Sequence, residues 1–262
     1  MTVVIFKFTD GNAPVSIMKN LIINADDFGL KSSVNKAIIQ SFDSKLINST
    51  TLMANMPGFE EAVELAHKHK IANQIGAHLV LTEGLPLTEE IKCLPYLFNK
   101  KTNSTTLFIK NLFFLNKNEQ TLIFKECCKQ IEKIKNNGIA ITHLDTHHQI
   151  HDMWAIFRII LELLRVYKIP FVRILNNLEK SEIHKNIYRN LINTKAKKLS
   201  INHTDYFGSR VDFMLKLKKN PNFIKTKTVE IMVHPDYNNN GDLVDLLHKK
   251  EYDLDFVKIL NQ

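Results

Sequence analysis

The sequence has few cysteines and no segment typical of a membrane protein. Its 262 residues include three cysteines, Cys93, Cys127 and Cys128, and no CxxC pair. Adjacent cysteines rarely pair with each other, so we expect a reduced, cytoplasmic protein without a disulfide framework. No apolar run reaches the roughly 18 residues of a membrane span, and the apolar start at 3–8 lacks a basic leader and a cleavage site. Because the first predicted strand follows Met18, we interpret residues 1–17 as a flexible N-terminal extension.

The sequence also lacks the short motifs of several common enzyme classes. It contains no GxGxxG, no GxxxxGK[ST] and no GxSxG, which argues against nucleotide binding and serine hydrolysis. The net charge is +8, from 35 basic and 27 acidic residues, but no block of five like charges occurs. This scatter indicates a solvated basic surface, and we expect neither a nucleic-acid nor a membrane partner.

Predicted strands and helices alternate along the chain, which is typical of an α/β protein with a parallel sheet or barrel. At 44% hydrophobic, residues 18–262 can form one domain with a sizeable core. We predict strands at 21–23, 47–53, within 75–84, from 138 onward, at 169–175 and at 228–235. We predict helices at 33–45, 57–69, 154–167 and 180–199, and mostly helical structure in 88–136. The remaining predictions are a loop at 203–208, a turn at 238–242, and a short helix with a tail in 243–260.

The stretch from Thr142 to His151 holds four of the eleven histidines, together with Asp145. Each buried imidazole needs hydrogen-bond partners, so such a run is poor material for a core. In an extended strand His143, Asp145 and His147 point to one face, because side chains alternate with a period of two. Two imidazoles and a carboxylate on one face suit a divalent metal or proton transfer.

Two adjacent aspartates, Asp26 and Asp27, end the first predicted strand. A turn there would direct both carboxylates into one cleft, where one can bind a metal while the other accepts a proton. The alternative is that one of them caps the helix that begins near Ser32. The dipeptide alone leaves both interpretations open.

Three further polar residues, His78, Arg173 and His234, lie in or at the ends of other predicted strands. Taken singly, His78 could be a structural histidine and Arg173 a surface or edge arginine. In α/β folds, however, functional sites gather at the carboxyl ends of parallel strands. The shared placement of these residues therefore predicts one metal-dependent active site.

Four motifs together resemble the YdjC-like carbohydrate deacetylases. They are the segments NADDFG at 24–29, GAHL at 76–79, HLDTH at 143–147 and VHP at 233–235, in the order and approximate spacing of that family. The resemblance covers about residues 18–250. It implies a distorted, TIM-like (β/α) barrel that removes N-acetyl groups from amino sugars or chito-oligosaccharides. It also implies a homodimer.

The resemblance assigns metal ligands by position. Asp27, His78 and His147 resemble the residues that hold one divalent ion in the family, usually taken as magnesium. Two imidazoles and a carboxylate would also accept zinc, so the ligand types alone do not fix the metal.

The resemblance also assigns catalytic roles. Asp26 resembles the catalytic base and His234 the general acid, and Arg173 falls where such deacetylases place an arginine near the base. Asp145 could orient a ligand imidazole. Gln149 stands where a histidine is common, which leaves the three ligands intact and could alter substrate contacts.

Two other classes of function share parts of this pattern. One is a metal-dependent hydrolase of glycosidic or phosphoester bonds, although a phosphoesterase favours two metals and more carboxylates than the sequence places. The other is a non-catalytic carbohydrate-binding protein, which would be expected to lack Asp26 or His234. Both residues are present.

Overall fold

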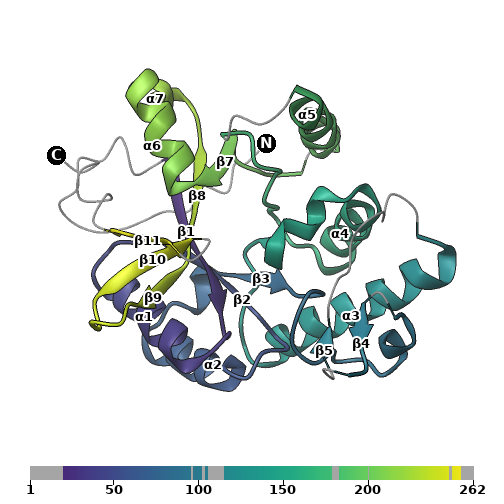
Figure 1. Cartoon of the computed structure of the whole chain (residues 1–262). Helices are drawn as coiled ribbons and strands as arrows, with labels where there is room; N and C mark the ends of the chain where they lie inside the picture. The colour runs from purple at the N-terminus through teal and green to yellow at the C-terminus, as the bar shows by residue number, and fades with distance from the viewer. Residues whose placement is uncertain are drawn as a thin grey trace.

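The centre of the protein is a six-stranded parallel sheet (Figure 1). The computed structural model describes residues 20–95, 97–101, 104–105, 115–178, 183–199, 201–247 and 250–254, so the predicted extension at 1–17 lies outside the described residues. The sheet order is β6-β3-β2-β1-β8-β7, with every neighbouring pair parallel. The strands are β1 (Leu21–Phe28), β2 (Ser49–Leu52), β3 (Ile75–Leu79), β6 (Leu144–Thr146), β7 (Tyr206–Ser209) and β8 (Val229–Val233).

An irregular segment, residues 171–178, joins the two edges of this sheet and completes a distorted barrel. Beside β6 it exchanges two backbone hydrogen bonds with Leu144, both 3.1 Å long. Beside β7 it donates two backbone hydrogen bonds to the Phe207 carbonyl, 3.1 and 3.2 Å long. The predicted α/β barrel is thereby confirmed. The prediction of a regular strand at 169–175 is wrong, because the chain crosses from one edge to the other and forms only isolated bridges.

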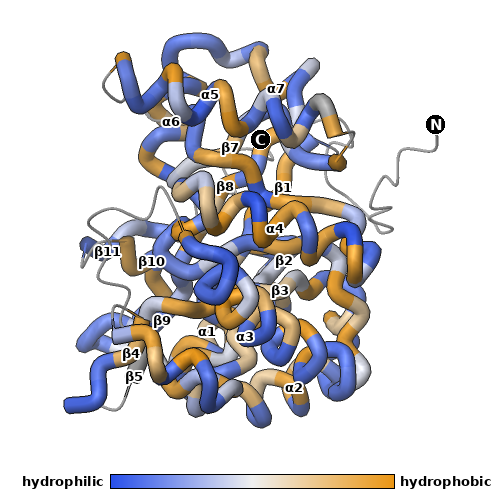
Figure 2. Tube along the Cα trace, turned by 90° about the vertical axis from the view of Figure 1, so that its right-hand side faces the viewer, coloured by the Kyte–Doolittle hydropathy of each residue, from blue (hydrophilic) through white to orange (hydrophobic). Residues whose placement is uncertain are grey.

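Helices surround the barrel, and most match the predicted ranges (Figure 1). They are α1 (Ser32–Asp43), α2 (Phe59–Lys68), α3 (Lys117–Asn136), α4 (Trp154–Tyr167), α5 (Ile183–Lys198), α6 (Arg210–Lys219) and α7 (Phe223–Thr226), with 3-10 turns η2 (Ala72–Gln74), η3 (Glu90–Cys93) and η4 (His147–Asp152). Hydrophobic and hydrophilic residues alternate along the helices in Figure 2, as expected for helices with one buried face. Among the described helices, none is long and apolar enough to cross a membrane.

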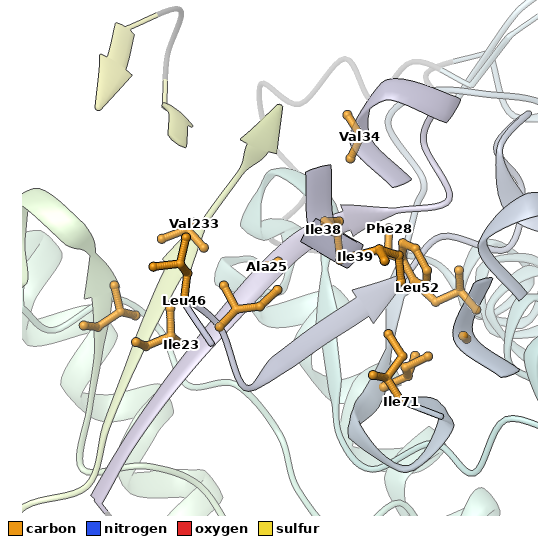
Figure 3. Packing of buried hydrophobic residues seen from close by; sticks show 14 of the residues in the cluster. Ile23, Ala25, Phe28, Val34, Ile38, Ile39, Leu46, Leu52, Ile71 and Val233 are labelled. Atoms are coloured by element: carbon orange, nitrogen blue, oxygen red, sulfur yellow. The ribbon is translucent and has the colours of Figure 1, made fainter. Parts of the chain in front are cut away.

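Buried apolar side chains fill the space between the sheet and the helices. In one cluster, Ile23 of β1 and Val233 of β8 belong to the same packed group as Ile38 of α1 (Figure 3). A second cluster lies between β3, β6, α3 and α4 and includes Leu79 and Ile160. Burial of apolar area at about 25 cal/mol per Å² is the main term that stabilises such a fold.

The C-terminal region differs from the expected short helix in 243–260. Strands β10 (Leu243–Leu247) and β11 (Lys250–Tyr252) instead form an antiparallel sheet with β9 (Pro235–Tyr237). The predicted turn at 238–242 is confirmed as the connection between β9 and β10. Pairing with β9 therefore decides the local structure, while residues 255–260 lie outside the described residues.

Two other segments are only partly as predicted. Within 88–136, α3 is preceded by η3 and by the short strands β4 (Phe98–Asn99) and β5 (Ser104–Thr105), while 106–114 lies outside the described residues. The loop predicted at 203–208 becomes strand β7 from Tyr206 onward, because these residues pair with β8.

We predict that Gly76 in β3 is required for the packing of His143. A Cβ at position 76 would lie 2.5 Å from a ring atom of His143, whose ring is held between Thr142 Oγ1 (2.8 Å) and Asn24 Oδ1 (3.1 Å). Gly76→Ala should lower the free energy of unfolding in urea by about 1–3 kcal/mol, the usual cost of overpacking. In a His143→Ala background the same substitution should cost much less. An equal cost in both backgrounds would contradict the steric explanation.

Candidate active site

Both aspartates at the end of β1 face the barrel interior because the strand is irregular there. Asp27 has a φ of 71°, in the left-handed region, and the register between β1 and β2 shifts at this point. A bulge re-aims side chains that would otherwise alternate, and aspartate tolerates this φ better than most residues do. Asp26 consequently meets Arg173, whereas Asp27 meets two histidines. Neither aspartate is the N-cap of α1, which is Lys31.

Asp27, His78 and His147 bring three ligand atoms together. The separations are 3.3 Å from Asp27 Oδ1 to His78 Nε2, 3.0 Å from Asp27 Oδ1 to His147 Nδ1, and 3.3 Å between the two imidazole nitrogens. Adjacent ligands of a cation at about 2.1 Å lie about 3.0 Å apart in an octahedron and about 3.4 Å apart in a tetrahedron. Asp27 Oδ1 is buried and has no hydrogen bond within the described part of the chain. These residues therefore fit a divalent cation, without distinguishing magnesium from zinc.

Each of the two imidazoles has a carboxylate at its other nitrogen. His78 Nδ1 lies 2.7 Å from Asp145 Oδ1, and His147 Nε2 lies 2.5 Å from Glu83 Oε1. Burial lowers the pKa of His78, but Asp145 and Asp27 outweigh it and raise the pKa to about 10. Burial likewise lowers the pKa of His147, but contacts with Asp27 and Glu83 raise it by more, so the net shift is upward. Binding of a cation would therefore displace protons from these nitrogens.

Arg173 is fully buried and contacts three buried carboxylates. Its Nη1 and Nη2 donate to Asp26 at 2.7 and 2.6 Å, its Nη1 also lies 2.7 Å from Asp145 Oδ2, and its Nε donates to Glu230 at 2.6 Å. The guanidinium also lies 4.7 Å from the ring centre of Phe207. Arg173 lowers the pKa of Glu230, but burial has the larger and opposite effect and raises this pKa to about 7. The alternative of a surface or edge arginine is thus wrong.

His234 follows β8 and is fixed by β10. The His234 N–H donates to Asp245 Oδ1 (2.8 Å), and His234 Nδ1 lies 3.9 Å from the same oxygen. Burial lowers the pKa of His234, but Asp245 and the charges of Asp27 and Asp26 raise it to about 9. The raised pKa favours the protonated form of His234, as a general acid requires.

The other histidines of the 142–151 stretch have different environments. His143 Nε2 lies 3.1 Å from Asn24 Oδ1, and His151 Nδ1 lies 2.6 Å from Thr146 Oγ1. Burial lowers the pKa of both His143 and His151 to about 4. His148 is exposed and contacts Thr82 Oγ1 at 3.0 Å. The shared face of His143, Asp145 and His147 is borne out, since each contacts residues of the barrel interior.

Sequence reasoning missed Glu83 and Asp245. Each is a single carboxylate in a segment that was expected to be a loop or a short helix, and the histidine partner of Glu83 is distant in sequence. The signal that could have found Glu83 is its position four residues beyond β3, at the end of the barrel where the ligands gather. Asp245 carries no such signal, because β10 was not predicted.

The geometry defines a class of protein, an α/β barrel with a candidate metal site at the carboxyl ends of its strands. A model of the YdjC-like protein family matches residues 20–257. The chain belongs to the YdjC-like family, as the sequence motifs predict.

Named relatives agree with this assignment. The chain is 31% identical over 223 residues to a carbohydrate deacetylase of Clostridium beijerinckii, covering 83% of this chain and 81% of the relative. It is 31% identical over 238 residues to a carbohydrate deacetylase of Brevibacillus brevis, covering 88% and 87%. A crystal structure from Enterococcus faecalis V583, described provisionally as a cellobiose-phosphate cleavage protein, superposes with a TM-score of 0.66 at 26% identity, covering 84% of this chain and 82% of that chain.

Removal of Arg173 should strongly destabilise the protein. Arg173→Met would leave three buried carboxylates without their cation, and breaking a buried pair in this way costs about 3–5 kcal/mol. Arg173→Lys keeps the charge but not the forked donor geometry, and should be intermediate. Urea unfolding measures the losses, with the exposed Arg158→Met on α4 as the matched control. A loss no larger than that of the control would contradict the role of Arg173.

Proposed function

We propose that this chain is a metal-dependent carbohydrate deacetylase that hydrolyses the N-acetyl group of an amino sugar or chito-oligosaccharide. The observation that carries the proposal is the meeting of Asp27, His78 and His147 near a carboxylate, Asp26, and an imidazole with a raised pKa, His234. The relatives named carbohydrate deacetylases supply the substrate class. An acetylated sugar is therefore the expected partner, and acetate and a free amine are the expected products.

A divalent cation held by Asp27, His78 and His147 would polarise the acetyl carbonyl and lower the pKa of the attacking water. We propose magnesium as the first ion to test, by family resemblance, and zinc as the alternative because two of the three ligands are imidazoles.

Two residues of the chain move protons in this proposal. Asp26 takes a proton from the attacking water, while Arg173 and Asn24 keep its carboxylate in place through hydrogen bonds of 2.6 to 2.8 Å. As the C–N bond breaks, His234 gives a proton to the departing nitrogen, which would otherwise leave as a very poor amide anion. Asp245 holds the backbone of His234 through a hydrogen bond to its N–H and lies 3.9 Å from the ring Nδ1.

Cleavage of a glycosidic or phosphoester bond is the competing proposal. It is motivated by the Enterococcus faecalis structure, which is described as that of a cellobiose-phosphate cleavage protein. Glycosidases use two carboxyl groups on either side of the bond, about 5–9.5 Å apart. Here Asp26, Asp145 and Glu230 all meet at one guanidinium, so none is free to lie across a sugar from another. This arrangement favours deacetylation.

The proposal extends to the location and the oligomeric state of the protein. The three cysteines are free, which supports our proposal of a reducing, cytoplasmic location. A homodimer is proposed from the family resemblance alone.

The purified protein should release acetate from N,N'-diacetylchitobiose, or from another member of a panel of N-acetylated sugars, when magnesium or zinc is supplied. Asp26→Asn should lower kcat by at least about 100-fold, the usual contribution of a general base. Asp43→Asn, on the exposed end of α1, is the matched control and should retain activity. Full activity of Asp26→Asn would exclude it as the base, and phosphate or glucose release without acetate would favour the competing proposal.

The pH dependence of kcat/KM should show a basic limb set by His234. A general acid must be protonated, so activity should fall as pH rises through its pKa. A cation beside Asp27 offsets part of the negative charge that raises this pKa, so the limb should lie between the ordinary histidine value of about 6.5 and about 9. Asp245→Asn should move the limb to lower pH, because it removes a carboxylate that raises the pKa. An unmoved limb would contradict the assignment of His234.

A further inference from the structure

Glu83 contacts the nitrogen of His147 that faces away from Asp27 and His78. His147 Nδ1 belongs to the ligand triangle, whereas His147 Nε2 lies 2.5 Å from Glu83 Oε1. A neutral imidazole carries one proton, and a carboxylate this close to Nε2 favours the proton there, which leaves the Nδ1 lone pair for the ion. The charge of Glu83 therefore favours the tautomer that can bind a cation through Nδ1.

The segment that carries Glu83 is fastened to α3 at both ends. Gln130 is fully buried, and its side chain accepts from Val80 N–H (2.9 Å) and donates to the Val80 carbonyl (2.7 Å). Glu126, also fully buried, accepts from Leu87 N–H (3.0 Å) and from Thr88 N–H (2.8 Å). These buried groups have no part in the proposed chemistry, and their bonds fix the path of residues 80–88.

Two further contacts hold the middle of the same segment. Asn55 Nδ2 donates to the Glu83 carbonyl (3.1 Å), and Thr82 Oγ1 lies 3.0 Å from His148 Nδ1. Gly84 has a φ of 73°, and a Cβ there would lie 2.6 Å from Met56 Sδ. Glu83 is thus presented to His147 by a backbone with little freedom.

We propose that Glu83 is a positioning residue that orients His147 for the cation, an inference that rests on the proposed metal site. Carboxylates behind metal-bound histidines fix the ring and raise its basicity. Asp145 likewise contacts the other nitrogen of His78, but Asp145 is fully buried and also contacts Arg173. The Glu83 side chain is 40% exposed, so the orientation of His147 depends on a carboxylate at the rim of the site.

The test is a titration of the metal-free protein with Co²⁺. Calorimetry measures the affinity and the number of ions bound, and visible absorption reports the coordination of the bound ion. The wild type should bind one ion per chain. Glu83→Gln should raise the Kd for Co²⁺ about 10-fold and Glu83→Ala up to about 100-fold, the usual range for partners of metal ligands, and both should alter the absorption spectrum. Glu89→Gln, an exposed glutamate beyond the same segment, should change neither quantity. His147→Ala gives the loss expected when the ligand itself is absent.

The outcomes separate the inference from the proposed function. Unchanged affinity and spectrum in both Glu83 variants, with a wild type that binds one ion, would overturn the role of Glu83 and leave the metal site intact. Two ions in the wild type and one in Glu83→Ala would make Glu83 a direct ligand and overturn the positioning role. A wild type that binds no ion would remove the metal site and the role of Glu83 together.

Discussion

The ion pairs of Arg173 are the constraint on which the rest of the structure depends. One guanidinium compensates carboxylates from the neighbouring strands β1 and β8 and from the edge strand β6. Three buried carboxylates without a cation would face a large desolvation cost. Because Arg173 lies in the irregular segment 171–178, the interaction that balances the charge is also the one that closes the barrel. Loss of regular strand geometry there is tolerated, since the ion pairs hold the segment to both halves of the sheet.

The same charges connect stability to the proposed chemistry. Asp145 contacts Arg173 through one oxygen and His78 through the other, so the network that closes the barrel also orients a candidate ligand. Asp26 is both a partner of Arg173 and the proposed base. Burial and Arg173 act in opposite directions on these carboxylates: the pKa of Asp145 lies well below its usual range, whereas the pKa of Glu230 is raised to about 7. Asp145 is therefore the more acidic of these two carboxyls, and Glu230 can hold a proton near neutral pH.

The sequence predicts much of this arrangement, and the parts that it does not predict share a physical cause. The strand pattern placed Asp27, His78 and His147 in or beside predicted strand ends, but only the family resemblance singled them out as candidate ligands. Asp245 could not be predicted, because β10 was not predicted, and Glu83 was missed because its partner His147 lies far along the chain. Strands β7, β10 and β11 were not predicted, because pairing with neighbouring strands rather than local pattern decides their structure. For Arg173 the position was predicted, but burial among three carboxylates depends on the tertiary fold alone.

Backbone strain explains why two of the candidate ligands, Asp27 and His147, converge at these strand ends. Asp27 at the end of β1 has a φ of 71°, and His148 and Gln149, directly after His147, have φ values of 54° and 50°. Each such non-glycine position costs about 1–3 kcal/mol and persists only where the surroundings enforce it. At β1 the strained turn directs Asp27 to the same side as Asp26. After β6 it ends the strand at once, so that His147 faces Asp27 while His151 is buried beside Thr146. Two separate strained turns therefore serve one purpose, the placement of Asp27 and His147 within 3.0 Å of each other.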